Sequence, residues 1–171
     1  PSSKKNHFNY LELDKKIINI IGDIRNFQLL NKSISEAKPD FIFHLAAQAL
    51  VRKSYKDTLE TYQTNVIGST NLLESVRLSD TVRSLIFITS DKCYENIEKD
   101  SGYDESSKLG GIDPYSASKA SAELIYSSYC RSFYKNKKNF GSASVRAGNV
   151  IGGGDWSNDR IIPDCVRSIE K

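Results

Sequence analysis

The chain has 171 residues, 39% hydrophobic and 26% charged, a balance typical of a folded globular protein rather than a disordered one. Its 24 basic and 21 acidic residues leave a net charge of +3, and the basic residues are scattered. Nucleic-acid binding needs a basic face or stripe, so we expect no nucleic-acid partner. No apolar run approaches the roughly 20 residues that cross a bilayer, so we expect no membrane partner.

The cysteine and histidine content argues against disulfides and metal sites. Cys93, Cys130 and Cys165 are far apart and odd in number, and His7 and His44 are the two histidines. Neither a disulfide framework nor a metal site fits this pattern, and a cytoplasmic setting is expected. The chain has no Met, no basic-then-apolar leader, and stops inside an expected helix, so we expect a piece of a longer protein.

Four short apolar runs predict strands, and helical stretches separate them. The expected strands are Ile17–Ile21, Phe41–Ala46, Ser84–Thr89 and Ser142–Val150. The expected helices are Asn26–Ala37, Thr58–Leu78 and Pro114–Tyr134, with a last one beginning near Asp159 or just after Pro163. This alternation predicts an α/β fold, a doubly wound Rossmann-like parallel sheet with helices on both faces and residues 1–171 in one domain.

One part of a dinucleotide-binding fold is missing from the sequence. Such a fold opens with a strand and a glycine-rich turn that lets backbone amides approach a pyrophosphate. The one glycine cluster, Gly152-Gly-Gly154, follows the fourth expected strand and is more typical of a flexible loop. If a dinucleotide binds, we expect its glycine-rich turn to precede Pro1.

Asp113-Pro114-Tyr115-Ser-Ala-Ser-Lys119 is the strongest local signal. Asp is a favoured N-cap and Pro a favoured first helical residue, so Tyr115 falls in the first turn with Lys119 one turn further on the same face. An ammonium near a phenol favours the phenolate, which could take a proton from a secondary alcohol. The alternative is an ordinary pair on a helix surface.

A second polar cluster, Ser90-Asp91-Lys92, follows the strand Ser84–Thr89. Ligands of parallel sheets bind beyond the carboxyl ends of the strands, so a hydroxyl, a carboxyl and an amine placed there suit a pocket shared with Tyr115. A solvated turn would explain Asp91 alone, but not its placement together with the capped helix.

Further candidates follow the other expected strands. Asp23 could accept hydrogen bonds from an adenosine or could simply close a turn. The small residues of Leu45-Ala46-Ala47 could admit a flat ligand or serve tight packing. His44 is expected to be a buried structural histidine. Asn149 and Arg160 could hold a diphosphate, or could belong to a surface loop.

Several motifs together resemble the extended short-chain dehydrogenase/reductases. They are Phe43-His-Leu-Ala-Ala-Gln48, Leu50-Val-Arg52, Thr64-Asn-Val66 and Thr89-Ser-Asp-Lys-Cys-Tyr-Glu-Asn96. With Leu109-Gly-Gly-Ile-Asp-Pro-Tyr115 and Arg146-Ala-Gly-Asn-Val-Ile-Gly-Gly-Gly-Asp-Trp156 the set is similar to the CDP-glucose 4,6-dehydratases, from about Gly22 to Asp164.

The resemblance implies an NAD-dependent lyase that dehydrates CDP-glucose to CDP-4-keto-6-deoxyglucose. Tyr115 would deprotonate the 4-hydroxyl while C4 passes a hydride to NAD, water would leave across C5 and C6, and the hydride would return to C6. Lys119 would position the nicotinamide ribose and tune Tyr115. Ser90 would donate to the C4 oxygen, and Asp91 would protonate the departing 6-hydroxyl.

The resemblance also implies contacts and partners. Asp23, Ile24, Leu45, Ala46, Ala47 and Thr64 would contact the cofactor with Tyr115 and Lys119, and Asn149 and Arg160 the substrate diphosphate. Residues 150–171 would begin a substrate-binding region. Thr58–Leu78 and Pro114–Tyr134 would pair in a homodimer through a four-helix bundle. Such enzymes usually feed dideoxysugar synthesis for bacterial surface polysaccharide.

Lys92 separates this group from related dTDP-sugar dehydratases, which carry a glutamate there as a base for the C5 proton. A lysine can act as that base only if burial or nearby positive charge lowers its pKa strongly. The alternatives are a dTDP- or GDP-linked dehydratase, an epimerase or reductase on the same scaffold, and an inactive fragment. Without the glycine-rich turn, we expect the 171 residues alone to bind NAD poorly.

Overall fold

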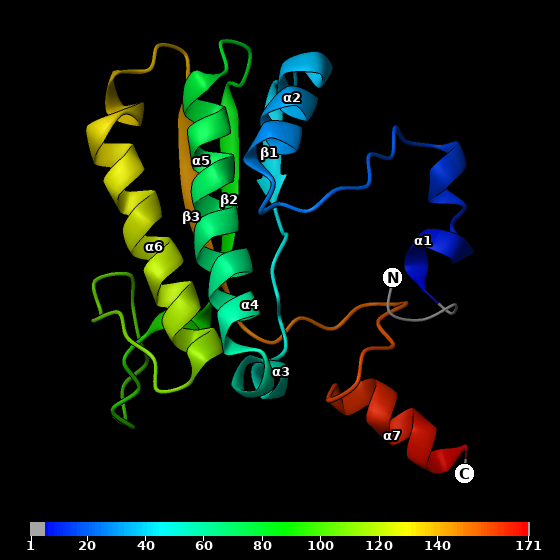
Figure 1. Ribbon diagram of the computed structural model, residues 1–171. Coiled ribbons are helices and arrows are strands. Elements are labelled where there is room, and N and C mark those ends of the chain that lie inside the picture. The colour runs from blue at the N-terminus through cyan, green and yellow to red at the C-terminus, as the bar shows by residue number, and fades with distance from the viewer. Residues whose placement is uncertain (1–5, 171) are drawn as a thin grey trace. The chain divides into compact units, whose positions relative to one another are not determined.

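The computed structural model describes residues 6–170, and these residues divide into two compact units (Figure 1). The larger unit is Gly22–Gly148. The smaller unit is formed by the described parts of 1–21 and 149–171. All the predicted catalytic residues and all the predicted cofactor contacts belong to the larger unit.

A three-stranded parallel sheet forms the centre of the larger unit. It consists of β1 (Phe41–His44), β2 (Ser84–Ser90) and β3 (Gly141–Ala147), in the order β1-β2-β3. Phe41 pairs with Ser84, and Ser84 with Gly141, so the three strands start in register and end at one edge. These strands confirm three of the four predicted ones, and they confirm the expected parallel α/β fold.

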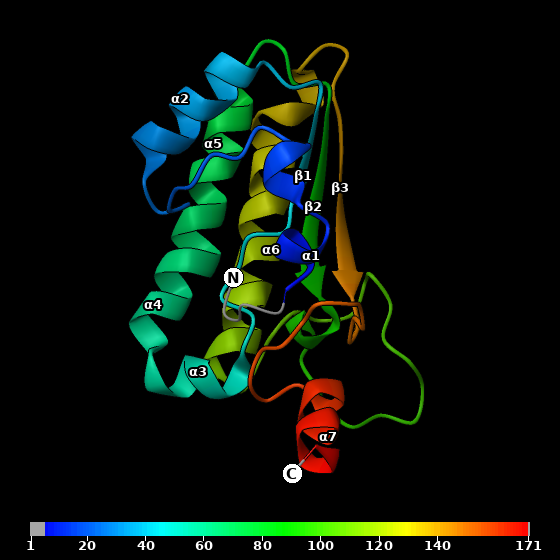
Figure 2. The same cartoon turned by 90° about the vertical axis from the view of Figure 1, so that its right-hand side faces the viewer.

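The helices of this unit lie on one face of the sheet (Figures 1 and 2). They are α2 (Phe27–Ala37), α3 (Val51–Lys56), α4 (Thr58–Tyr62), α5 (Ser69–Leu78) and α6 (Pro114–Ser132). Three-residue 3₁₀ turns at Asp91–Cys93 and Tyr134–Asn136 follow β2 and α6. The predicted helix Thr58–Leu78 is confirmed, but a π-helical segment, Gln63–Gly68, joins α4 to α5.

The hydrophobic core lies between the helices and the sheet. Leu85 and Phe87 of β2 are almost fully buried there against Leu73 and Val76 of α5 and Tyr126 of α6. Because side chains alternate across a strand, every second residue of β2 points into this core. The sheet therefore presents one well-packed face to the helices.

The opposite face of the sheet carries no helix of this unit. Phe41 and Phe43 of β1 are 67% and 65% exposed, and Val145 of β3 is 43% exposed. Helices were predicted on both faces of the sheet, but within Gly22–Gly148 they cover one face. The apolar residues at alternating positions still suit a strand that is covered on both sides.

The smaller unit contains α1 (His7–Tyr10), a 3₁₀ turn at Leu13–Lys15 and α7 (Ile161–Ile169). The start of α7 confirms the last predicted helix. The predicted strand Ile17–Ile21 is wrong, because this segment is irregular and Ile18 and Ile21 are 93% and 88% exposed. A strand needs a neighbour for its backbone groups, and no described strand pairs with this segment.

Among residues 6–170, no helix is both long enough and apolar enough to cross a membrane.

Candidate functional site

The start of α6 has the geometry that the sequence predicts. Asp113 caps the helix, accepting a 2.9 Å hydrogen bond from the Ser116 amide through Oδ1, and Pro114 is the first helical residue. Tyr115 and Lys119 follow at a spacing of four on one helical face, each only 8% exposed. The Tyr115 amide donates to Ser54 Oγ (3.2 Å), which ties the helix start to α3.

Lys119 is 8% exposed, and no hydrogen bond or ion pair joins its ammonium to another residue in the part of the chain that the structure describes. Burial lowers the pKa of Lys119, and the nearby Glu123 carboxylate opposes that effect. Burying an unpaired ammonium costs free energy, so such groups are typically ligand-binding. Lys119 is therefore suited to receive hydrogen-bond acceptors from a bound molecule.

His44 lies at the end of β1 and acts as a structural residue, as expected from the sequence. It is 5% exposed, its Nε2 lies 3.0 Å from Ser69 Oγ, and its ring packs on Phe87 at 4.8 Å. Burial, with a smaller effect of the Lys119 charge, lowers the pKa of His44 to about 4. The imidazole is thus neutral at neutral pH.

The Ser90-Asp91-Lys92 segment forms a compact hydrogen-bonded turn at the end of β2. Ser90 Oγ donates to Asp91 Oδ1 (3.0 Å) and accepts from the Lys92 amide (3.2 Å). Lys92 Nζ also donates to Asp91 Oδ1 at 3.2 Å. Ser90 is buried, whereas Asp91 is exposed, so the turn directs a carboxylate and an amine toward solvent-accessible space.

The turn Asp91–Cys93 packs against α6, which brings the two predicted clusters to one edge of the sheet. A cavity of about 630 Å³ opens there. Its lining comes from the loop after β2, the start of α3 and the start of α6: Val51, Asp91, Lys92, Tyr94, Asn96, Tyr103, Gly111, Ile112, Asp113 and Ser116. Asp91 and Lys92 therefore line a cavity large enough for a small ligand, beside the helix that carries Tyr115 and Lys119.

Asn65 in the π-helical segment connects three parts of the site. Its Nδ2 donates to Gln48 O (3.0 Å) and Ser118 Oγ (2.9 Å), and its Oδ1 accepts from the Gln48 amide (2.8 Å). Ser118 Oγ in turn donates to Tyr115 O at 2.6 Å. The motif Thr64-Asn-Val66 was recognised in the sequence, where a cofactor contact is predicted for Thr64, but this structural role of Asn65 was not predicted.

A buried ion pair that the sequence analysis missed lies behind the site. Glu123, one turn beyond Lys119 on α6, is 3% exposed and accepts a 3.0 Å hydrogen bond from Arg146 Nη2. Arg146 lies inside β3, within the predicted strand Ser142–Val150. A charged residue within an apolar strand, together with a glutamate among the small residues of α6, was the available signal for a buried pair.

The predicted cofactor contacts differ in their exposure. Ala46 is exposed, whereas Ala47 and Thr64 are half-buried. Leu45 is 70% exposed, so Leu45-Ala46-Ala47 forms an open surface rather than a packed one. Ile24 contacts Gly68 of the π-helical segment through its side chain. These placements leave the predicted contacts untested.

Asp23 is already engaged by a neighbouring cation. Its carboxylate accepts hydrogen bonds from the amide of Arg25 (2.9 Å) and from the guanidinium, with Nη2 at 2.5 Å. These bonds lower the pKa of Asp23 to about 2. A bound adenosine would have to share this carboxylate with Arg25.

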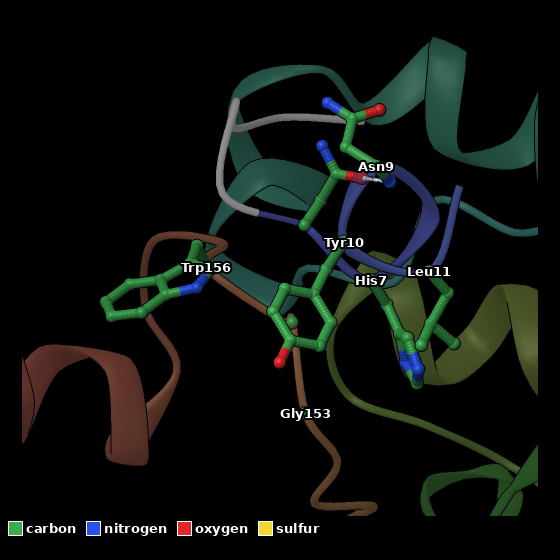
Figure 3. A pocket seen from close by; sticks show the side chains of 8 residues that line it. His7, Asn9, Tyr10, Leu11, Gly153 and Trp156 are labelled. Atoms are coloured by element: carbon green, nitrogen blue, oxygen red, sulfur yellow. Dashed lines mark hydrogen bonds between the residues drawn. The ribbon is translucent and has the colours of Figure 1, made fainter. Parts of the chain in front are cut away.

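Asn149 and Arg160, the predicted diphosphate contacts, belong to the smaller unit. Arg160 Nε lies 3.5 Å from Asp155 Oδ2, immediately before α7. The same unit has its own cavity of about 630 Å³, in which Figure 3 shows His7 and Tyr10 on one segment and Trp156 on the other. This cavity includes neither Asn149 nor Arg160, so their role stays a prediction.

Comparison with known proteins identifies the family to which this chain belongs. The sequence profile of the GDP-mannose 4,6 dehydratase family matches residues 2–145, and the chain therefore belongs to that family. The chain is 51% identical over 168 residues to the CDP-glucose 4,6-dehydratase of Salmonella typhimurium, covering 95% of the chain and 46% of that protein. It is 32% identical to the CDP-paratose 2-epimerase of Salmonella typhi, over 74% of the chain and 42% of that protein.

The solved structures that resemble this chain are also nucleotide-sugar dehydratases and epimerases. A dTDP-glucose 4,6-dehydratase double mutant from Streptomyces venezuelae with NAD bound matches with a TM-score of 0.79 and 27% identity, over 95% of the chain and 47% of that structure. The UDP-glucose 4-epimerase of Thermus thermophilus, in complex with NAD, matches with a TM-score of 0.71 and 28% identity, over 81% and 43%. The chain thus spans less than half the length of these relatives.

Proposed function

We propose that the full-length protein is an NAD-dependent lyase that dehydrates CDP-glucose to CDP-4-keto-6-deoxyglucose. The main support is the packing of the turn Asp91–Cys93 against α6, where Tyr115 and Lys119 lie on one face. An alcohol-oxidising pair and a carboxylic acid at one sheet edge suit an oxidation coupled to loss of a hydroxyl. The 51% identity to a CDP-glucose 4,6-dehydratase supports the substrate.

The residues present fit a nicotinamide cofactor. The buried Lys119 ammonium has no partner among the described residues, and it would hold the hydroxyls of the nicotinamide ribose. Leu45, Ala46 and Ala47 would lie along the cofactor, because Leu45 and Ala46 are exposed and the two alanines are small enough for a flat molecule to approach the backbone. When bound, NAD supplies the acceptor for the hydride that leaves C4 and later returns to C6.

Tyr115 and Ser90 serve the oxidation step in this proposal. Tyr115 takes the proton of the 4-hydroxyl as the general base. Ser90, buried at the end of β2, donates a hydrogen bond to the C4 oxygen as its carbonyl forms. The 4-keto group then makes the hydrogen on C5 acidic.

Asp91 and Lys92 serve the elimination. A base removes the C5 proton, and Asp91 gives a proton to the 6-hydroxyl, so that the oxygen leaves as water and a C5–C6 double bond forms. The base for the C5 proton is Lys92, whose side chain lines the same cavity as Asp91, or another group of the full-length protein. Simple oxidoreductases and epimerases need no acid for a leaving hydroxyl, so this pair favours a dehydratase.

The test is conversion of CDP-glucose by the full-length protein, followed through the alkali-sensitive 4-keto product. Tyr115→Phe should lower kcat by at least about 100-fold, the scale of a lost general base. Tyr126→Phe is the matched control on the same helix, because its hydroxyl bonds to Ser142 Oγ (3.0 Å) in the core. An unchanged rate in Tyr115→Phe would remove the proposed base.

The nucleotide is tested in the same assay with dTDP-glucose and GDP-mannose. We expect CDP-glucose to give the highest kcat/KM. A higher value for either other nucleotide would replace CDP-glucose as the substrate. A product in which one carbon of the sugar has the inverted configuration, with no loss of water, would mean that the protein is an epimerase.

We further propose a homodimer in which the helix of residues 58–78 and α6 pair with their copies. These helices lie side by side on the outside of the larger unit, and both carry exposed apolar residues. Leu59, Ile67 and Leu124 are 71%, 52% and 60% exposed. Leu124→Lys should therefore shift the full-length protein to monomer in light scattering, whereas Ile112→Lys, at an exposed position outside these helices, should leave the dimer intact.

A further inference from the structure

The Glu123 carboxylate accepts hydrogen bonds from three side chains. Its Oε1 accepts a hydrogen bond from Thr89 Oγ1, and its Oε2 accepts from Ser144 Oγ (3.1 Å) and from Arg146 Nη2 (3.0 Å). Thr89 belongs to β2, and Ser144 and Arg146 belong to β3. One carboxylate on α6 therefore joins the helix to two neighbouring strands, β2 and β3.

Arg146 uses its other side to hold the loop that follows the catalytic turn. Its Nη1 donates to Glu105 O at 3.3 Å, and its Cζ lies 5.0 Å from the centre of the Tyr94 ring. Tyr94 stacks on Tyr103 at 5.3 Å, and both rings line the cavity that contains Asp91. The guanidinium therefore connects Glu123 to the cavity wall.

The hydrogen bonds of Glu123 and Arg146 connect the turn that carries the proposed acid with the helix that carries the proposed base. Thr89, paired with Arg146 in the sheet, directly precedes Ser90 and Asp91. Glu123 follows Lys119 by one helical turn and Tyr115 by two, on the same face of α6. A shift of Glu123 would therefore move the helix that carries the base relative to the turn that carries the acid.

The charge balance also matters for Lys119. Arg146 supplies the ion-pair partner of Glu123, and no ion pair joins Glu123 to Lys119 among the described residues. The other ionisable groups that act on Lys119 and its neighbours are His44 on β1 and Cys93 after β2. Arg146 thus leaves the Lys119 ammonium available to a ligand.

We propose that Glu123 and Arg146 are positioning residues that set the separation between the Tyr115–Lys119 helix and the Ser90–Asp91–Lys92 turn. The kinetic part of this inference rests on the proposed function. The structural part does not, because it concerns contacts within the larger unit.

Two variants of the full-length protein test the inference. Glu123→Gln keeps the shape of the side chain but replaces one acceptor oxygen by a donor, so at least one of the three donors around it loses its partner. Arg146→Lys keeps the charge but lacks the fork that reaches both Glu123 and Glu105. Tyr134→Phe is the control, since it removes a buried 2.6 Å hydrogen bond to Leu73 O after the far end of α6.

The first measurement is steady-state kinetics at a temperature where all variants are folded. Both variants should lower kcat about 10- to 100-fold, because a misplacement of about 1 Å can cost that much. KM for the sugar nucleotide should change less than about threefold, and Tyr134→Phe should change neither constant. A loss of kcat in Tyr134→Phe of the same size would show a general effect of lost stability and would overturn the positioning role.

The second measurement is amide hydrogen exchange, which needs no turnover. The amides of Glu95 and Gly110 donate to Lys108 O and Cys93 O (each 2.9 Å) and close the loop that Arg146 holds. Both should exchange about tenfold faster in Glu123→Gln and Arg146→Lys, and at the wild-type rate in Tyr134→Phe.

The two measurements separate this inference from the proposed function. An inactive wild type would refute the proposed function, and hydrogen exchange would then decide whether the ion pair holds the loop. Unchanged exchange in both variants would overturn the inference. Faster exchange with an unchanged kcat would also overturn it, because the ion pair would then be purely structural.

Discussion

Asn65 Nδ2 donates a 2.9 Å hydrogen bond to Ser118 Oγ, across 53 positions of the sequence. This bond joins the π-helical segment between α4 and α5 to the first turns of α6. Ser118 is fully buried, and its hydroxyl donates a hydrogen bond to the backbone carbonyl of Tyr115. The proposed base is thus positioned by a polar contact that only the folded chain creates.

Replacing Asn65 should therefore cost both stability and activity. Asn65→Ala leaves the buried amide of Gln48 and the hydroxyl of Ser118 without this partner, so the free energy of unfolding should fall by about 3 kcal/mol. Denaturant unfolding measures the effect. Asn71→Ala, at a partly buried position whose side-chain amide donates to the carbonyls of Ile24 and Arg25, should cost less than about 1 kcal/mol. Equal losses in the two variants would contradict the prediction.

Replacing Lys119 and replacing Lys137 by Met should change the free energy of unfolding in opposite directions. Lys119→Met removes a buried and unpaired ammonium, so it should raise the free energy of unfolding of the cofactor-free protein by about 1 kcal/mol while abolishing activity. Lys137 Nζ donates to the carbonyls of Val76 (3.1 Å) and Ser79 at the end of α5, so Lys137→Met should lower stability by about 1 kcal/mol. Destabilisation by Lys119→Met would mean that its ammonium has a partner in the full-length protein.

His44 should make stability depend on pH. Its pKa is about 4 in the folded protein and about 6.5 when unfolded, so the unfolded state binds more protons between these values. The contribution of neutral His44 to the free energy of unfolding is fully present above pH 6.5 and is lost as the pH falls toward 4. Between pH 7.5 and pH 5 the free energy of unfolding should fall by about 2 kcal/mol. In His44→Gln this contribution should vanish. His7→Gln, at an exposed position, should retain this contribution. Denaturant unfolding at several pH values measures it, and the same pH dependence in the wild type and in His44→Gln would disprove the prediction.

Asp91→Asn should separate oxidation from loss of water. The amide keeps the size of the side chain but cannot protonate the 6-hydroxyl, so kcat for the 4-keto-6-deoxy product should fall about 100-fold. Mass spectrometry should then detect a keto sugar nucleotide that retains its 6-hydroxyl. Asp104→Asn changes a carboxylate that caps Ser106 (3.0 Å) in an exposed loop and should leave kcat unchanged. A similar loss in both variants would argue against Asp91 as the acid.

Sequence reasoning was most successful where local chemistry determines structure. The cap at Asp113, the first-turn position of Tyr115 and the strand Ser84–Thr89 were all predicted, because capping and apolar runs act over a few residues. It failed for Ile17–Ile21, whose apolar pattern suits a strand but which has no strand to pair with in the described chain. It also missed the break in the helix over residues 58–78, because a π-helical segment has no simple sequence signature.

The sequence by itself determined the chemistry of this protein: the motif around Tyr115 and Lys119, the Ser90-Asp91-Lys92 cluster and membership of a dehydratase family. Only the tertiary structure decided which groups support that chemistry. It left Lys119 unpaired and placed Glu123 against Arg146, residues that are 23 positions apart on a helix and a strand. The physical reason is that a motif depends on neighbours in sequence, whereas the pairing of a buried charge depends on which elements pack together.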